Sequence, residues 1–265
     1  WPLCTLLSMA LLAHTLALLA MPVATMAITV VPLDMALNSF DDQYLTCGKV
    51  MDEKLQELIH ADLQNNPLLA QVWQKAVAEY VRRGISMSPL SREQAFAVTA
   101  YTTKSLSAPF NTAVREYGNS GQEDMKKFHF KSLHFLLTRA VQKLRLSQCL
   151  LVFRGVRNYQ YRVKEGDRVR FGQFASTSRS QRVSQSYGRD TMFRVTTCHG
   201  ADIQRFSFNP SEQEVLVPPF ETFVVTKVTQ DGGTMNIDLR SSETFSKHNC
   251  TWLRGDSLGT AWEDW

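Results

Sequence analysis

Apolar residues between positions 51 and 145 recur at the three- and four-residue spacing that places side chains on one face of a helix. One stripe is formed by Met51, Leu55, Leu58 and Ile59, and a second by Leu69, Val72, Trp73, Ala76, Val77 and Tyr80. Gly84 follows the second stripe and is expected to end that helix. Ser91 and Gln94 have the spacing of a capping box, which predicts a helix reaching Ala100. A fourth helix is expected over residues 123–145.

Short apolar or alternating segments replace the helical pattern after about residue 146. They cover residues 149–153, 169–171, 192–197, 215–217, 222–228 and 235–239. Asp231-Gly232-Gly233 lies between the last two and is typical of a hairpin turn. Helices followed by mostly antiparallel strands indicate an α+β domain, with a helical N-terminal half packed on the strands, and not a doubly wound sheet. Neither a GxGxxG fingerprint nor a P-loop is present.

The first 27 residues carry no lysine, arginine, aspartate or glutamate, and residues 6–20 form an apolar run. Thr25 and Ala27 are small residues at the spacing of a cleavage site, so residues 1–27 are predicted to be a signal peptide. A retained membrane anchor is the alternative, because the apolar run approaches the length of a membrane span. Residues 28–265 are expected to form a single domain with its core at about 34–250, without a stable membrane span. The short polar segment 256–265 does not resemble the hydrophobic tail of a lipid-anchor signal.

Composition narrows the function classes. The chain has 265 residues, of which 44% are hydrophobic, and this is enough to build a substantial core. Its formal net charge of +4 is mild, and no run of lysine and arginine resembles a basic arm. A nucleic-acid partner is therefore not expected.

Cysteine usage agrees with export. Cys4 lies in the predicted leader, which leaves Cys47, Cys149, Cys198 and Cys250 for the exported domain. An even number of cysteines in an exported protein predicts two disulfides, with three possible connectivities. No CxxC pair is present, so a metal site is not expected.

Three features of the second half suggest chemistry. Arg154 ends an apolar segment and is followed by Gly155, an arrangement that can hold a phosphate where the backbone comes close to a ligand. Small hydroxyl residues occupy 176–178. Glu212 and Glu214 follow a proline-containing turn, and their spacing of two places both on one face of an extended, exposed segment. Singly, each feature has a structural explanation: a salt bridge, strand hydroxyls and a solvated strand entry.

Together these features resemble a known family. Arg154, Ser176-Thr177-Ser178 and Glu212-Gln213-Glu214 match, in this order, the Arg, Ser-x-Ser and Glu-x-Glu elements of the arginine-specific mono-ADP-ribosyltransferases of the vertebrate ecto-enzyme family. Residues 39–44, 100–102 and 171–175 also look like family signatures, and the resemblance spans about 34–250. It implies the ADP-ribosyltransferase fold, with helices packed on a mostly antiparallel two-sheet β core. It also implies NAD, or alternatively NADP, as a co-substrate, with no permanently bound cofactor.

The resemblance assigns roles to individual residues. Glu214 would stabilise the cation that forms when the bond between ribose and nicotinamide breaks, and Ser176 would orient Glu214. Arg154 would hold the diphosphate, while Gly155 would let the nicotinamide carboxamide approach the backbone. Glu212 would hold and deprotonate the guanidinium of an acceptor arginine. Further candidates for NAD contacts are Tyr101, Gln173 and Ser207.

The resemblance also selects one disulfide connectivity, Cys47–Cys250 with Cys149–Cys198. The implied function is transfer of ADP-ribose from NAD to arginine on extracellular or secretory-pathway proteins, with release of nicotinamide. NAD glycohydrolysis at the same site is an alternative, since water can replace the guanidinium. An extracellular binding domain without catalysis is another, although the complete Arg, Ser and Glu set argues against it.

The leader makes localisation testable. Expression in a secreting animal cell is expected to release a protein that begins near Ile28 into the medium, because the leader has the features of a cleaved signal peptide. N-terminal sequencing of the protein in the medium checks this. Recovery in the membrane fraction alone, with the leader retained, would support the membrane-associated alternative.

Overall fold

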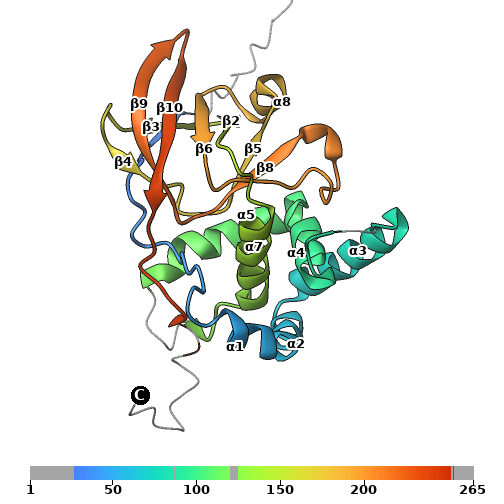
Figure 1. Cartoon of the computed structure of the whole chain (residues 1–265). Coiled ribbons are helices and arrows are strands. Elements are labelled where there is room, and N and C mark those ends of the chain that lie inside the picture. The colour runs from blue at the N-terminus through green and yellow to red at the C-terminus, as the bar shows by residue number, and fades with distance from the viewer. Residues whose placement is uncertain (1–26, 86–87, 120–124, 252, 254–265) are drawn as a thin grey trace, which may run out of the picture.

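The computed structural model describes residues 27–85, 88–119, 125–251 and 253. Helices α1–α5 and α7 lie on one side of the strands, and the short helix α8 lies on the other side of the molecule, beside β2 and β5 (Figure 1). The helices are α1 Gly48–Glu53, α2 Leu55–Asn65, α3 Pro67–Arg83, α4 Arg92–Tyr101, α5 Lys104–Glu116, α7 Lys131–Leu144 and α8 Gln181–Tyr187, with 3-10 turns η1 Tyr117–Asn119 and η2 Pro210–Glu212. The predicted α+β class is confirmed.

Local signals set the ends of two helices. Asn66 caps α3 by accepting a hydrogen bond from the Leu69 backbone, and Gly84 ends the helix in the left-handed conformation that glycine adopts without strain. Ser91 and Gln94 form the predicted capping box at the start of α4. These helices begin and end close to where the sequence predicts.

The helical half also departs from the prediction in two places. The helix expected over residues 123–145 begins only at Lys131, after turns at residues 126–127 and 129–130, and residues 120–124 lie outside the described residues. The helix α5, which contains Pro109, was also not predicted from the sequence. Proline removes one helical hydrogen bond, so its presence inside a helix disfavours the assignment from sequence.

The strands form one eight-stranded sheet in the order β4-β9-β10-β6-β2-β5-β8-β7 and a separate parallel pair, β1 with β3. Within the large sheet β6 and β10 pair in parallel, and the other neighbours pair antiparallel. The strands are β1 Thr29–Pro32, β2 Leu150–Val156, β3 Tyr159–Arg162, β4 Arg168–Val169, β5 Ala175–Ser178, β6 Thr191–Thr197, β7 Ala201–Asp202, β8 Glu214–Val217, β9 Glu221–Asp231 and β10 Thr234–Thr244. The predicted hairpin turn joins β9 to β10.

The large sheet has a seam between β2 and β5. These strands pair through a single residue pair, Phe153 with Ser178, whereas β2 and β6 pair along their whole length. The strands β5, β8 and β7 are therefore joined to the rest of the eight-stranded sheet through this one residue pair. One cluster of buried apolar residues comes mostly from the strands and includes Val152, Val195 and Val215. A larger cluster joins the helices to Phe174 and Leu216.

Two disulfides have the connectivity that the resemblance implies. Cys47 is bonded to Cys250, 203 residues away, and Cys149 is bonded to Cys198. The first bond fixes the segment before the helical half to the segment after the last strand. None of the helices in the described part of the chain combines the length and apolar character of a membrane span.

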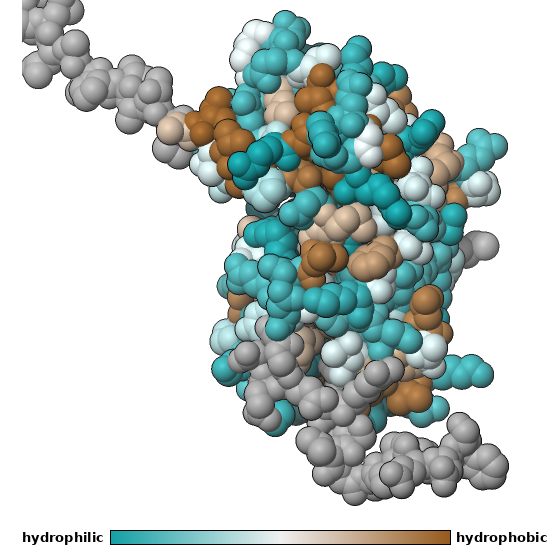
Figure 2. Space-filling view, turned by 90° about the vertical axis from the view of Figure 1, so that its left-hand side faces the viewer, coloured by the Kyte–Doolittle hydropathy of each residue, from teal (hydrophilic) through white to brown (hydrophobic). Residues whose placement is uncertain are grey.

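One face of the molecule carries apolar side chains near the start of the described chain. Ile28 and Val30 are exposed, and Figure 2 shows brown atoms beside the point where the described chain begins. The rest of this face mixes polar and apolar residues (Figure 2).

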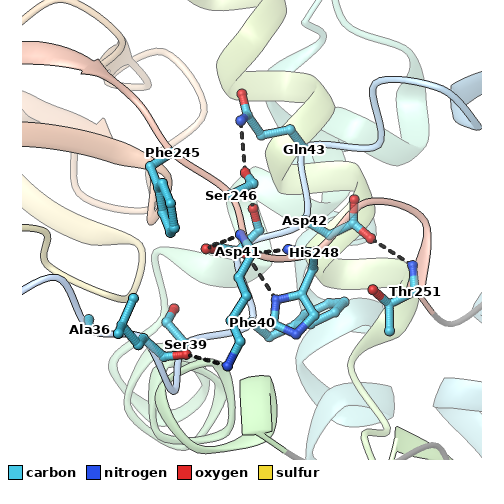
Figure 3. Close-up of polar contacts among 12 residues, drawn as sticks. Ala36, Ser39, Phe40, Asp41, Asp42, Gln43, Phe245, Ser246, His248 and Thr251 are labelled. Carbon is cyan, nitrogen blue, oxygen red and sulfur yellow. Dashed lines mark hydrogen bonds and ion pairs between the residues drawn. The ribbon is translucent and has the colours of Figure 1, made fainter.

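The buried carboxylate of Asp41 connects segments that are far apart in the sequence (Figure 3). It forms an ion pair with Arg170 at 2.6 Å, and it accepts hydrogen bonds from the backbone of Lys247 and His248. The ring nitrogen Nδ1 of His248 lies 2.9 Å from the same carboxylate. Burial opposes ionisation of Asp41, but the hydrogen bonds from His248 and Arg170 hold its pKa below the usual range.

Replacing Asp41 with asparagine tests this connection. Asp41→Asn leaves Arg170 buried without its carboxylate, so the free energy of unfolding at pH 7 is expected to fall by about 3–5 kcal/mol. Because the folded-state pKa of Asp41 is lowered, its stabilisation is present above roughly pH 4 and is lost as the pH falls below it. Chemical denaturation of both proteins at pH 7 and at pH 3 measures the loss of unfolding free energy at each pH.

The matched control is Asp52→Asn, at an exposed position of α1. It is expected to leave the free energy of unfolding nearly unchanged at both pH values. An equal loss for Asp41→Asn at pH 7 and pH 3 would contradict a role for the ionised carboxylate.

Candidate functional site

A cavity of about 370 Å³ lies where β2, β5 and β8 meet α8 and the chain around the end of α4. The sequence-predicted residues Tyr101, Arg154, Gly155, Ser176, Glu212 and Glu214 all line it. The seam of the sheet lies at this cavity, since Arg154 belongs to β2 and Ser176 to β5. The structure therefore brings the Arg, Ser and Glu elements together from three separate strands and a turn.

Glu214 is the first residue of β8, opposite Ser178 of β5, and its side chain is buried. The pKa of this carboxyl is raised to about 7, mainly by burial and to a smaller extent by the negative charge of Glu212. A hydrogen bond from Ser176 and the positive charge of Arg154 act in the opposite direction. A carboxylate held in this way can stabilise a positive charge that develops beside it.

Ser176 is held from behind by a buried polar group. The Tyr101 hydroxyl donates to the Phe174 carbonyl at 2.9 Å and lies 3.3 Å from the Ser176 hydroxyl. The Asn111 amide donates to both the Tyr101 oxygen and the Phe174 carbonyl. Burial and the nearby charge of Glu214 raise the pKa of Tyr101 to about 12, so its hydroxyl stays protonated as a donor. Tyr101 therefore fixes the strand that carries Ser176.

Arg154 and Gly155 have structural as well as potential ligand contacts. Arg154 Nη1 donates to the backbone carbonyl of Ser176 at 2.8 Å across the seam. A Cβ at residue 155 would lie 2.1 Å from the carbonyl oxygen of Ser184 and 2.4 Å from that of Gly188. Glycine is required here because the α8 segment packs directly on β2, and this packing was not predicted from the sequence.

Glu212 and Glu214 reach the same cavity by a different route from the one expected. They do not share one face of an extended segment: Glu212 ends the turn η2, Gln213 is left-handed with φ of 48°, and Glu214 starts β8. Glu214 is also buried, which corrects the expectation of an exposed turn for both residues. The left-handed backbone of Gln213 interrupts the extended geometry, and both carboxylates line the cavity.

Glu212 has two neutral hydrogen-bond partners. The Asn209 amide donates to Glu212 Oε1 at 3.0 Å, and the Tyr187 hydroxyl donates to the same carboxylate. Partial burial and this hydrogen bond raise the pKa of Tyr187. The backbone carbonyl of Glu212 accepts from the Ser178 hydroxyl at 2.7 Å, which ties the turn to β5.

Tyr187 was not predicted from the sequence, because its contact with Glu212 is tertiary. The available signal was Ser180, whose side chain accepts from the Val183 backbone as the N-cap of α8. A helix starting there places Val183 and Tyr187 on one face, and both line the cavity.

Two of the further NAD candidates do not line this cavity. Gln173 lines a second cavity of about 930 Å³ and accepts a hydrogen bond from Arg115. Arg154 lines both cavities. Ser207 is buried beside the turn before Glu212, where its hydroxyl accepts from the Asn209 backbone and its carbonyl accepts from Arg83. In the described residues no cluster of three or more histidine, cysteine, aspartate or glutamate side chains is arranged to hold a metal ion.

Burial of Glu214 is expected to cost stability at high pH. Its folded-state pKa of about 7 exceeds the ordinary value of 4.5, so above pH 4.5 ionisation favours the unfolded chain, by about 3 kcal/mol once the pH exceeds 7. Glu214→Gln should therefore have a higher Tm than the unaltered protein at pH 8, and this gain should shrink at pH 5. Glu116→Gln, at an exposed position of α5, is the control. A gain that is the same at both pH values would contradict the raised pKa.

Comparison with known proteins identifies the family. Residues 33–247 match the family model described as NAD:arginine ADP-ribosyltransferase. The chain is 45% identical over 234 residues to NAD(P)(+)--arginine ADP-ribosyltransferase 1 of Gallus gallus, covering 86% of this chain and 75% of the relative. It is 41% identical over 243 residues to ecto-ADP-ribosyltransferase 5 of Homo sapiens, covering 87% and 84%.

A solved structure agrees with these relatives. The crystal structure of a mutant of the eukaryotic mono-ADP-ribosyltransferase ART2.2 in complex with NAD matches with a TM-score of 0.72 at 35% sequence identity. The match covers 84% of this chain and 99% of that one. The chain therefore belongs to the NAD:arginine ADP-ribosyltransferase family.

Proposed function

We propose that this site transfers ADP-ribose from NAD to the guanidinium of arginine in proteins and releases nicotinamide. The observation that carries the proposal is the buried carboxylate of Glu214, hydrogen-bonded by Ser176 and facing the charge of Arg154. The comparisons support the reaction class, because the matched family and its named members act with NAD on arginine.

Bond breaking needs charge stabilisation more than acid catalysis. The bond between ribose C1′ and the nicotinamide nitrogen breaks, and its electron pair leaves with the nicotinamide, which is a good leaving group. The ribose is left with an oxocarbenium character, and the Glu214 carboxylate stabilises this positive charge. Glu214 must be ionised for this role, so its pKa of about 7 predicts that activity rises as the pH passes through neutrality.

The two cavities suggest how NAD lies in the site. Arg154 borders both, so a diphosphate bound at its guanidinium would place one half of NAD in each. The nicotinamide ribose then lies beside Ser176 and Glu214, with the carboxamide near Gly155. The adenosine half extends toward Gln173, and the same argument holds for NADP as an alternative co-substrate. Tyr101 and Ser207 act indirectly, by supporting Ser176 and the turn that carries Glu212.

Glu212 receives the acceptor. Its hydrogen bonds come from Asn209 and Tyr187, which are neutral, so its charge is available to a guanidinium. A guanidinium nitrogen attacks ribose C1′, and the proton that it loses passes to the Glu212 carboxylate. When water takes the place of the guanidinium, the products are ADP-ribose and nicotinamide. A binding domain without catalysis is disfavoured, because Arg154, Ser176 and Glu214 are all present in one cavity.

The expected leader and the disulfides support a proposal for the place of action. Residues 1–27 are proposed to be a signal peptide and residues 28–265 a single exported domain. Two disulfides in one domain suit an oxidising compartment, and the human relative is named an ecto-enzyme. The acceptors are therefore arginine-bearing proteins outside the cell or in the secretory pathway, and the enzyme is proposed to be secreted.

The two carboxylates are expected to separate in their effects. Glu214→Gln removes the charge that stabilises the ribosyl cation, so transfer and NAD hydrolysis should both fall by about a hundredfold or more. Glu212→Gln should abolish arginine modification but leave measurable NAD hydrolysis, because water needs less positioning than a guanidinium. Labelled NAD with the arginine analogue agmatine measures both reactions.

A neutral replacement elsewhere provides the control for this pair. Glu243→Gln changes an exposed carboxylate on β10 and should leave both reactions intact. The assignment is wrong if Glu212→Gln destroys hydrolysis as thoroughly as transfer, or if Glu214→Gln retains either activity near normal.

A further inference from the structure

A groove of about 660 Å³ adjoins the site on the side of Glu212. It shares Lys104, Arg157, Tyr187 and Glu212 with the 370 Å³ cavity, and Arg182 on α8 lines the groove but not that cavity. The groove therefore begins at the carboxylate that is proposed to receive the acceptor and continues along α8.

The groove is strongly cationic. Lys104, Arg157 and Arg182 line it and are exposed, whereas Glu212 is its one acidic lining residue within the described chain. Lys104 Nζ lies 5.9 Å from the centre of the Tyr187 ring, and Arg157 donates to the backbone carbonyl of Ser186 at 3.3 Å. Across the described parts of the chain, no carboxylate forms an ion pair with any of these three cations.

This charge pattern constrains an acceptor that is itself a cation. A guanidinium that approaches Glu212 along this groove comes close to three positive side chains, whose combined charge exceeds that of the groove's one carboxylate. Negative residues beside the acceptor arginine would pair with those cations and remove the repulsion. A basic neighbour would add to the repulsion instead.

We propose, on the basis of the function proposed above, that the groove selects acceptor proteins in which aspartate or glutamate lies next to the modified arginine. The arginine binds Glu212, and its acidic neighbours lie along α8 against Arg182, Arg157 and Lys104. Asn209 and Ser211 also line the groove, where the Ser211 hydroxyl donates to the Asn209 side-chain oxygen at 2.6 Å.

Lys104 and Arg157 also line the cavity proposed for NAD, so changes at either would mix two effects. Arg182 lines the groove without lining that cavity, and this makes it the residue to alter.

The experiment uses the full chain, NAD and three end-capped peptides that contain one arginine. The peptides are identical except that the arginine is flanked by glutamate, by glutamine or by lysine. We expect kcat/KM for ADP-ribosylation to be highest with glutamate and lowest with lysine, differing by about tenfold in total for a few exposed charge pairs. The difference should shrink in high salt, because a Debye length of about 8 Å at physiological ionic strength falls to about 3 Å at 1 M.

Arg182→Glu is expected to weaken or reverse the preference, given as the ratio of kcat/KM for the glutamate peptide to that for the lysine peptide. Arg240→Glu, at an exposed position of β10, makes the same charge change elsewhere and should preserve the ratio. A ratio that Arg182→Glu leaves unaltered would overturn the inference. A raised KM for NAD with that unaltered ratio would assign the cation to NAD binding.

Two further outcomes separate the inference from the proposed function. Equal rates with all three peptides, alongside normal modification of agmatine, would overturn the groove's role and leave the transferase function standing. Hydrolysis of NAD without modification of any peptide or of agmatine would overturn the transferase function and the inference with it.

Discussion

The buried ion pair of Asp41 and Arg170 is the constraint on which the arrangement of this domain depends. Two opposite charges taken out of water are stable together only when their remaining hydrogen-bonding groups are satisfied. Arg170 meets this condition by donating to the carbonyls of Met35, Ala36 and Phe245. The segment before α1, the chain after β10 and the approach to β5 must therefore all be in place at once. The Cys47–Cys250 disulfide joins two of these segments covalently.

In contrast to Asp41, the carboxylate of Glu214 in the site is buried without a full set of hydrogen-bond partners. Glu214 has Ser176 as its hydrogen-bond donor, and the negative charge of Glu212 works against its ionisation. The hydrogen-bonded side chains of Tyr101 and Asn111 keep Ser176 in place. Ser176 on β5 and Glu214 on β8 therefore lie on paired strands and not on a loop. The ion pair of Asp41 with Arg170 and the two disulfides stabilise the fold and offset the free energy that burial of Glu214 costs.

Local chemistry explains which parts of the fold the sequence predicts. The ends of α3 and α4 depend on side chains within four residues, and the β9–β10 turn depends on adjacent glycines, so all three can be read from the chain. The order of the Arg, Ser and Glu elements along the chain is enough to predict them. Sequence patterns do not predict the contact of Tyr187 with Glu212 or the packing of α8 on Gly155, because each joins segments that are separate in the sequence. The prediction that Glu212 and Glu214 lie on one face of an extended segment was wrong, because Gln213 between them is left-handed.

The seam between β2 and β5 gives Arg154 a second task. Where the backbone pairs through one residue pair, the Arg154 guanidinium reaches across and binds the Ser176 carbonyl. The side chain that is proposed to hold the diphosphate thus also helps to bring the two parts of the sheet together. A loss of activity in any variant of Arg154 would then combine weaker binding of NAD with a displaced Ser176. The two contributions can be separated only if the distance across the seam is measured in the variant itself.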